Sequence, residues 1–464
     1  MLRHSLYLQN LQHAYKIDDQ ILSLGLNASH AVGYSEGLDR GEWASKMASR
    51  DIYSVLAVPN FRWLWAGSLG SSFAMNMQII ARGWFVYDLT SSAMDLAWVT
   101  LSFMLPSVLF SLYGGVLADR LSKRKLIVFA QSLNAIATLI MAWIIFSGTV
   151  VFWDFIWFGF FNGSILALSM PARQAFVPEL IPQPLIFTAM ALNTTGWNLS
   201  RIVGPALAGL LIAWLADGDK QSAFGVGMVY LVIAGLYLSS ALTMLLVDVP
   251  GDSPQTRRGG TYNEMRDGLA YVFAQPRIFA LLLLSIIPFL FGMPLNTLLP
   301  AFNQDVLGGH ADSLGILVSA MGGGAIIGSM MMAAMGDMRR KGRWLVISSL
   351  AWAGATAAFG VTGNVALAMF AIALIGLVSA WNMSLNRGLL QHTVDAHMRG
   401  RIMSIDMMFH GLMPLGVFPI SWVAEHHGVA TALMVSGIAF VVTIALSIVL
   451  SPAVRAMTRD ASAQ

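Results

Sequence analysis

The sequence of 464 residues contains no cysteine and little charge, since Asp, Glu, Lys and Arg together make up 11% of it. The absence of cysteine excludes a disulfide framework, a thiol nucleophile and a cysteine metal site. No Walker P-loop, H-E-x-x-H or G-x-S-x-G motif occurs in a suitable context, which argues against an ATP-driven pump and a hydrolase. The basic residues are not gathered on one soluble face, so we expect no nucleic-acid partner. We also expect no metal and no cofactor.

What the sequence has in abundance is apolar residues, at 56%, with a mean hydropathy of +0.67. A bilayer core about 30 Å thick needs roughly 20 apolar residues for one helical crossing, and runs of that length are too long for alternating barrel strands. We therefore predict an all-α membrane protein with twelve transmembrane helices. The predicted spans are residues 62–85, 95–118, 126–147, 152–172, 187–214, 222–247, 277–301, 312–335, 344–362, 364–386, 402–424 and 427–451.

Lysine and arginine are distributed very unequally between the predicted loops. Loops after even-numbered spans carry sixteen of them, and loops after odd-numbered spans carry only Lys220. By the positive-inside rule, both termini are expected on the cytoplasmic side of a bacterial inner membrane, with membrane lipid as a partner.

A polar linker after six spans divides the chain, and the two parts carry similar decorations. DRLSKRKLIV begins at Asp119 after the second span, and DMRRKGRWLV begins at Asp337 after the eighth. Internal repeats of this kind are typical of secondary transporters, so we predict two six-helix pseudo-repeats. The expected divisions are a polar N-terminal tail (1–57), a first bundle (58–247), a cytoplasmic linker (248–276), a second bundle (277–451) and a cytoplasmic tail (452–464).

Residues Gly115–Lys125 fit the pattern G-x-x-x-D-R-x-G-x-[RK]-[RK], with Ser122 in place of the second glycine. Further matching stretches are NFRWLWAG, MQIIARGWFVYDLTSSA, MPARQAFVPELIP, ALNTTGWNLSRIVGPALAG, LPAFNQDVLGG and MRGRIMSIDMMFHGLMPLG. From about residue 55 to 450 the chain resembles the enterobactin-exporter-like branch of the major facilitator superfamily. The resemblance implies the major facilitator fold and a proton-driven exporter of siderophores or amphipathic drugs, here expected to be a monomer.

The charged loop after the second span is the first candidate for a mechanistic role. The resemblance implies that Asp119 faces the N-terminus of span eleven, whose partial positive charge stabilises an acid. Loss of that contact would then favour one conformational state over another. The alternative is that the cations of this loop only fix topology and bind headgroups. We assign to this conformational latch Gly115, Asp119, Arg120, Arg124 and Asp337.

Arg82 lies within the first apolar run, near Asn76 and Gln78. A guanidinium at that depth costs at least ~2.5 kcal/mol unless it faces a cavity or a partner. A role in binding an anionic substrate or a titrating acid is one interpretation. Snorkelling of the side chain to the membrane surface near Asp88 is the other.

Asp406 and His410 are four residues apart on the eleventh span, so they share a helix face and could form a proton relay. Alternatively, Asp406 caps a helix or pairs with Arg401. Further polar residues predicted to line a substrate or proton pathway are Asn193, Asn198, Arg201, Asn382 and Asn386. The small or bending residues Gly204, Pro205 and Gly209 are predicted at a helix interface, opposite the glycines of span eight or in ordinary tight packing.

The sequence thus favours a proton-coupled exporter of a small amphipathic or anionic metabolite of the siderophore kind. A broad-range drug exporter of the same fold is the first alternative. A lipid or lysophospholipid flippase, or a membrane sensor without transport activity, is another.

Overall fold

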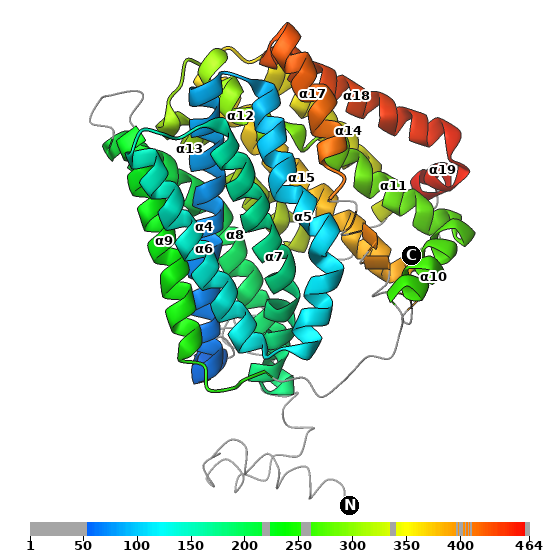
Figure 1. Ribbon diagram of the computed structural model, residues 1–464. Helices are drawn as coiled ribbons and strands as arrows, with labels where there is room; N and C mark the ends of the chain where they lie inside the picture. The colour runs from blue at the N-terminus through cyan, green and yellow to red at the C-terminus, as the bar shows by residue number, and fades with distance from the viewer. Residues whose placement is uncertain are drawn as a thin grey trace, which may run out of the picture. The chain divides into compact units, whose positions relative to one another are not determined.

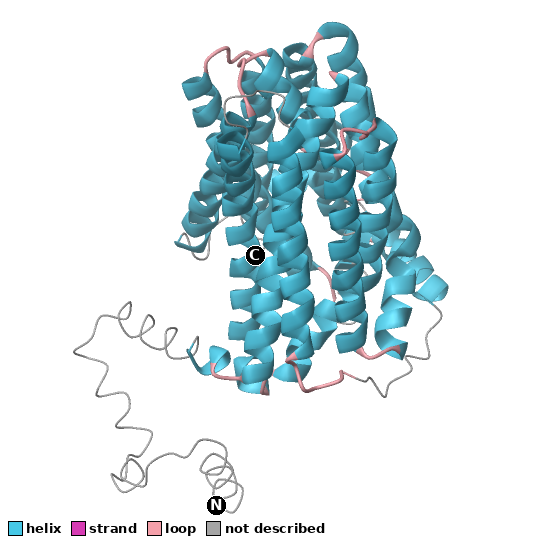
Figure 2. Ribbon diagram, turned by 60° about the vertical axis from the view of Figure 1, so that its left-hand side comes forward, coloured by secondary structure: helices cyan, strands magenta, loops and turns pink. Residues whose placement is uncertain are grey.

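The computed structural model describes residues 53–215, 223–251, 261–334, 340–395 and 411–459, together with 398, 402, 403, 405, 406 and 408. The chain divides into two units, residues 1–57 and 58–464, and the second unit holds all the helices α4 to α19. Figure 2 shows that the described part of this unit consists of helices and loops, without a strand. The predicted latch residue Asp337 and the predicted relay residue His410 lie outside the described residues.

The helices of the first half follow the predicted apolar runs and begin at recognisable signals. Pro59 occupies the first turn of the first helix, where its missing N–H leaves no bond unmade. Ser92 and Ser122 cap the next two helices by accepting backbone N–H bonds from Asp95 and Lys125. The elements are α4 (Pro59–Thr90), α5 (Ala93–Arg120), α6 (Lys123–Phe146), α7 (Phe152–Leu180), η2 (Gln183–Leu185), α8 (Ile186–Leu215) and α9 (Ala223–Leu245).

In the second half, the seventh predicted span is two helices rather than one. It breaks between Phe291 and Pro294, because a proline at the start of a helix cannot continue the hydrogen bonds of the preceding one. The elements are α10 (Thr261–Ala274), α11 (Pro276–Phe291), α12 (Pro294–Asp305), α13 (Ala311–Ala334), α14 (Lys341–Gly360), α15 (Val365–Thr393), α17 (Pro414–His427), α18 (Val429–Leu450) and α19 (Pro452–Arg459).

Within the described residues, nine stretches are long and apolar enough to cross a membrane, with α11 and α12 counted as one. The all-helical membrane class predicted from composition is therefore confirmed. Helix α4 is not among the nine, and it is the helix that carries Asn76, Gln78 and Arg82. These polar residues lower the hydropathy of the first predicted span.

The two halves are joined mainly by two helix pairs, α8 with α13 and α5 with α17. Figure 1 shows α6, α7 and α9 of the first half on the left and α11, α18 and α19 of the second half on the right. At the α8–α13 contact a Cβ on Gly209 would overlap the carbonyl oxygen of Ala311 and lie 3.0 Å from the Cα of Gly315. Glycine at 209 therefore allows the two backbones to meet directly.

Candidate functional site

Arg82 lies on α4 inside the first half, with 7% of its side chain exposed. Its guanidinium carbon lies 5.1 Å from the ring centre of Phe103 on α5, which is a cation–π distance. The Nη1 atom is buried without a hydrogen-bond acceptor, and no described carboxylate forms an ion pair with Arg82. The structure thus holds a buried cation whose charge is not balanced by any described acid.

The neighbours of Arg82 are phenols and amides. Tyr230 and Tyr237 on α9 both lie within electrostatic range of the guanidinium. The Tyr237 hydroxyl donates to Oε1 of Gln78 at 3.3 Å, whereas the buried Tyr230 hydroxyl has no partner. The guanidinium is thus surrounded by aromatic rings and by one hydroxyl without a partner.

A second arginine, Arg173 on α7, also enters the first half. Its Nη1 donates to Oγ of Ser71 at 2.8 Å and of Ser68 at 3.2 Å, both on α4. The sequence placed this residue in a loop, because the fourth span was predicted to end at residue 172 beside Pro171. The helix instead continues to Leu180. An arginine directly after an apolar run was the signal that could have revealed it.

The second half holds a buried acid, Asp406, with 2% exposure. Oδ1 of Asp406 accepts a hydrogen bond of 2.6 Å from Ser285 on α11. From α15, Asn386 donates its Nδ2 to the carbonyl of Leu281 at 3.0 Å, and its buried Oδ1 has no donor. This combination places a carboxylate and an unused amide acceptor in one region of the second half.

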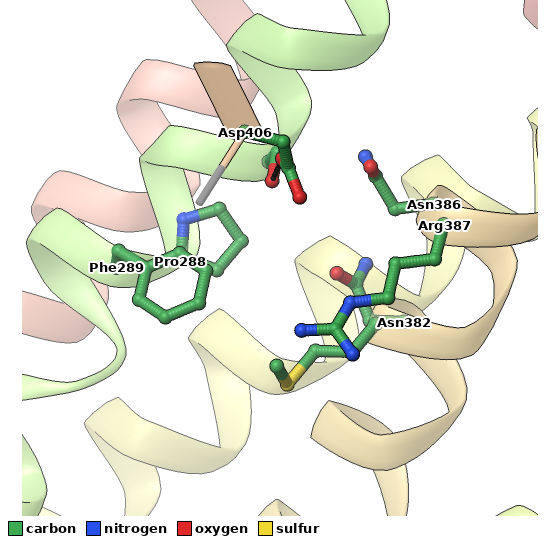
Figure 3. A pocket seen from close by; sticks show the side chains of 8 residues that line it. Pro288, Phe289, Asn382, Asn386, Arg387 and Asp406 are labelled. Carbon is green, nitrogen blue, oxygen red and sulfur yellow. Dashed lines mark hydrogen bonds between the residues drawn. The ribbon is translucent and has the colours of Figure 1, made fainter. Parts of the chain in front are cut away.

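Asp406 and Asn386 line a small cavity together with Ser285, Asn382 and Arg387 (Figure 3). Its volume is about 10 Å³, room for about one water molecule. Figure 3 shows Asp406 on one side of the cavity and Asn386 and Arg387 entering from α15 on another. A single water could thus contact both the carboxylate and the unused oxygen of Asn386.

Asn382 is tied to the scaffold more firmly than Asn386. Its Nδ2 donates to Oγ of Ser349 at 2.8 Å and of Ser348 at 3.0 Å, both on α14, and also reaches the Leu345 carbonyl. These bonds join α15 to α14, so Asn382 positions the helix that presents Asn386.

Two cations that follow the second predicted span, Lys123 and Arg124, form bonds that hold the fold together. Lys123 is 1% exposed, forms an ion pair of 2.8 Å with Glu179 and donates to the carbonyl of Gly251. Arg124 donates to the carbonyls of Met244 and Leu245 at the end of α9. Arg124 therefore fastens the end of α9, and Lys123 the chain that follows it, to the start of α6. The sequence did not reveal this role because the partners are distant along the chain.

Several other predicted site residues do not line the cavity of Asp406. Asn76 is buried and donates to the Ser72 carbonyl of its own helix, while Asn193 is half-buried and Asn198 and Arg201 are exposed. In α5, Arg120 is exposed, and the surroundings of Gly115 and Asp119 lie outside the described part. Gly204 packs against Asn76, where an added Cβ would lie 3.1 Å from the Asn76 Cβ, and the Pro205 carbonyl lies beside Gly315.

Residues 51–464 match the family model described as transmembrane secretion effector. The staphyloferrin A transporter of Staphylococcus aureus is 26% identical over 361 residues, covering 77% of this chain and 88% of the relative. Macrolide efflux protein A of Streptococcus pyogenes is 26% identical over 387 residues, covering 81% and 92%. The enterobactin exporter EntS of Shigella boydii is 26% identical over 289 residues, covering 62% and 67%.

Solved structures show the same fold. The nucleoside transporter NupG superposes with a TM-score of 0.65 at 16% identity, over 86% of this chain and 99% of that one. A bacterial homologue of the lysosomal transporter Spinster gives a TM-score of 0.64 at 15% identity, over 86% and 97%.

Proposed function

Because the chain belongs to the transmembrane secretion effector family of the major facilitator superfamily, we propose that it exports a small amphipathic anion of the siderophore class. Members of this family are efflux transporters of small molecules and not enzymes. The proposal adds the substrate class, the driving ion and the arrangement in the membrane. That arrangement is twelve spans in two halves, residues 58–247 and 277–451, joined by a linker, with both termini cytoplasmic.

The observation that carries the substrate class is the unbalanced charge of Arg82. An arginine buried in a membrane bundle costs at least ~2.5 kcal/mol unless a partner or water compensates it. With Nη1 lacking an acceptor, the compensating group is expected to come from the substrate. A catecholate or carboxylate supplies a negative charge, and the surrounding rings of Phe103, Tyr230 and Tyr237 suit an aromatic or apolar body.

We assign the proton to Asp406. When protonated, its carboxyl carries an O–H donor, and the Oδ1 of Asn386 in the same cavity is an acceptor without a donor. The proton-loaded state would therefore satisfy a group that the structure leaves unpaired, directly or through one water. His410, one turn further along the predicted span, would pass the proton onward.

The test is uptake into inverted membrane vesicles, with and without an imposed pH gradient. Enterobactin and staphyloferrin A serve as catecholate and carboxylate probes, and erythromycin serves as a cationic one. Accumulation of at least one anionic probe should depend on the gradient and fall more than tenfold in Arg82→Ala, a loss of about 1.4 kcal/mol or more in transition-state stabilisation.

Arg62→Ala is the matched control, because Arg62 is an exposed arginine on the same helix. Its uptake should equal that of the parent protein. Undiminished anion uptake by Arg82→Ala would contradict the assignment.

A broad-range drug exporter is the second candidate, favoured by the likeness to macrolide efflux protein A over 81% of the chain. Macrolides carry a basic amine, and a positive charge near Arg82 is repelled. In the vesicle assay this candidate predicts uptake of erythromycin that Arg82→Ala leaves unchanged or increases.

A further inference from the structure

Glu425, near the C-terminal end of α17 in the second half, is bonded to the start of α5 in the first half. Its Oε2 accepts the backbone N–H of Ala93 at 2.8 Å and of Met94 at 3.3 Å. The hydroxyl of Ser92 donates to the same oxygen at 3.3 Å. One carboxylate of the second half thus receives three donors from the first.

These donors belong to the group of backbone N–H atoms that a helix leaves unpaired at its N-terminus. Ser92, the residue before α5, takes only the N–H of Asp95. Ala93 and Met94 have their partner in the other half. A carboxylate at this position also meets the partial positive charge of the helix end, which strengthens its bonds. Separation of α17 from α5 would break all of them together.

The seam beside Glu425 is closed by further contacts between the halves. Tyr87 at the end of α4 donates to Oδ2 of Asp305 at the end of α12, at 2.5 Å. One turn further along α5, Ala97 is fully buried and packs with Met413 and Val417. These contacts hold the two halves together at the N-terminal end of α5.

Helices α5 and α17 run antiparallel. Ala93 meets Glu425, Ala97 meets Val417, and Val108 approaches Gly411, so residue numbers rise along one helix as they fall along the other. In such a pair the C-terminal end of each helix lies beside the start of the other span. The C-terminal end of α5 carries Asp119, the residue that the sequence pattern assigns to a latch on span eleven.

We propose that Glu425 is a second latch, which caps the start of α5 and holds this end of the transporter shut, while Asp119 serves the opposite end. A rocking movement that opens the Glu425 end releases Glu425 from the N-terminus of α5. The same movement would bring Asp119 to the N-terminus of span eleven. The exchange would keep the two states close in free energy, as alternating access requires. The latch does not depend on which molecule is exported.

The experiment measures how often the Glu425 end opens. The chain has no cysteine, so the single substitution Ala97→Cys places one thiol at the buried seam without further changes. The rate of its reaction with a polar maleimide, measured on the purified protein in detergent without substrate, reports opening whatever the orientation in the membrane. In the Glu425→Ala background this rate should rise about tenfold, the loss expected for a helix cap of about 1.4 kcal/mol.

Asp154→Asn is the matched control. Asp154 accepts the N–H of Val151 at the start of α7, so it is an acid at a helix start whose bond stays within one half. It should leave the labelling of Ala97→Cys unchanged. Glu425→Gln, which keeps an acceptor but loses the charge, should give an intermediate rate.

An unchanged rate in Glu425→Ala would overturn the proposal, as would an equal rise in Asp154→Asn. Circular dichroism melting of each variant separates opening from unfolding. A rate increase accompanied by loss of the melting transition would also count against the latch. Because no substrate enters the experiment, its result stands apart from that of the vesicle assay.

Discussion

The first half of the molecule buries an arginine side chain, and the second half buries a carboxylate. Arg82 and Arg173 project into the first, whereas Asp406 lies in the second. Three charged side chains are buried among the described residues: Arg82, Lys123 and Asp406. Lys123 has Glu179, and Asp406 has the hydroxyl of Ser285, but Nη1 of Arg82 has no acceptor.

This difference separates structural from functional charge. A buried cation with its own acid holds the fold together, and breaking such a pair is costly. A buried cation without an acid destabilises the empty protein and is expected to be balanced by a ligand. The two halves would then divide the transport task, with the anion bound in the first and the proton in the second.

Lys123→Met gives the largest expected effect on stability. The substitution removes the ion pair with Glu179 and the bond to Gly251. The free energy of unfolding should fall by about 2–3 kcal/mol, less than for a fully buried pair because Glu179 is 35% exposed. Thermal melting of the purified protein measures it. Lys125→Met, at an exposed lysine in the same first turn of α6, should leave the melting temperature nearly unchanged. Equal melting of both variants would show that the pair is unimportant.

Arg173→Met and Arg82→Met should shift stability in opposite directions. Arg173 loses two bonds to serine hydroxyls, which should cost about 1.5 kcal/mol. Arg82 loses an unbalanced charge and gains an apolar side chain, which should stabilise the empty protein by about 1 kcal/mol. The same melting experiment compares the two. A large destabilisation by Arg82→Met would mean that the arginine serves the fold, and the contrast between paired and unpaired charge would fail.

Asp406→Asn should change coupling more than folding. The amide has nearly the same shape but cannot exchange a proton, so the acceleration of anion transport by a pH gradient should drop about tenfold, or about 1.4 kcal/mol. Exchange of anion for anion across the membrane without a gradient should persist. Asp154→Asn supplies the control acid outside the cavity. Full dependence on the gradient in Asp406→Asn would place the coupling group elsewhere.

The sequence predicted what depends on local composition. Most apolar runs correspond to helices of the structure, and of the two interpretations of Arg82 that the sequence left open, burial inside the first half is the one observed. The break between α11 and α12 was missed, although Pro294 marks it, because the surrounding residues are as apolar as those of an unbroken span.

What the sequence could not predict depends on contacts between distant segments. From the sequence alone, Lys123 would be taken for a surface cation. In the structure it pairs with Glu179, near the C-terminal end of α7. Glu425 reads as an exposed acid at a helix end, and only the packing of α17 on α5 brings it to Ala93. Residue type and spacing carry no information on which helix ends meet.

Equilibrium binding of a charged and a neutral probe of equal shape tests the central claim most directly. Salicylate carries a carboxylate where salicylamide carries an amide, so the pair differs in the charge that Arg82 would meet. The account predicts that the purified protein binds salicylate at least tenfold more tightly than salicylamide, that Arg82→Met abolishes this preference, and that Arg62→Met retains it. Equal affinity for the two probes, or a preference that survives Arg82→Met, would contradict it.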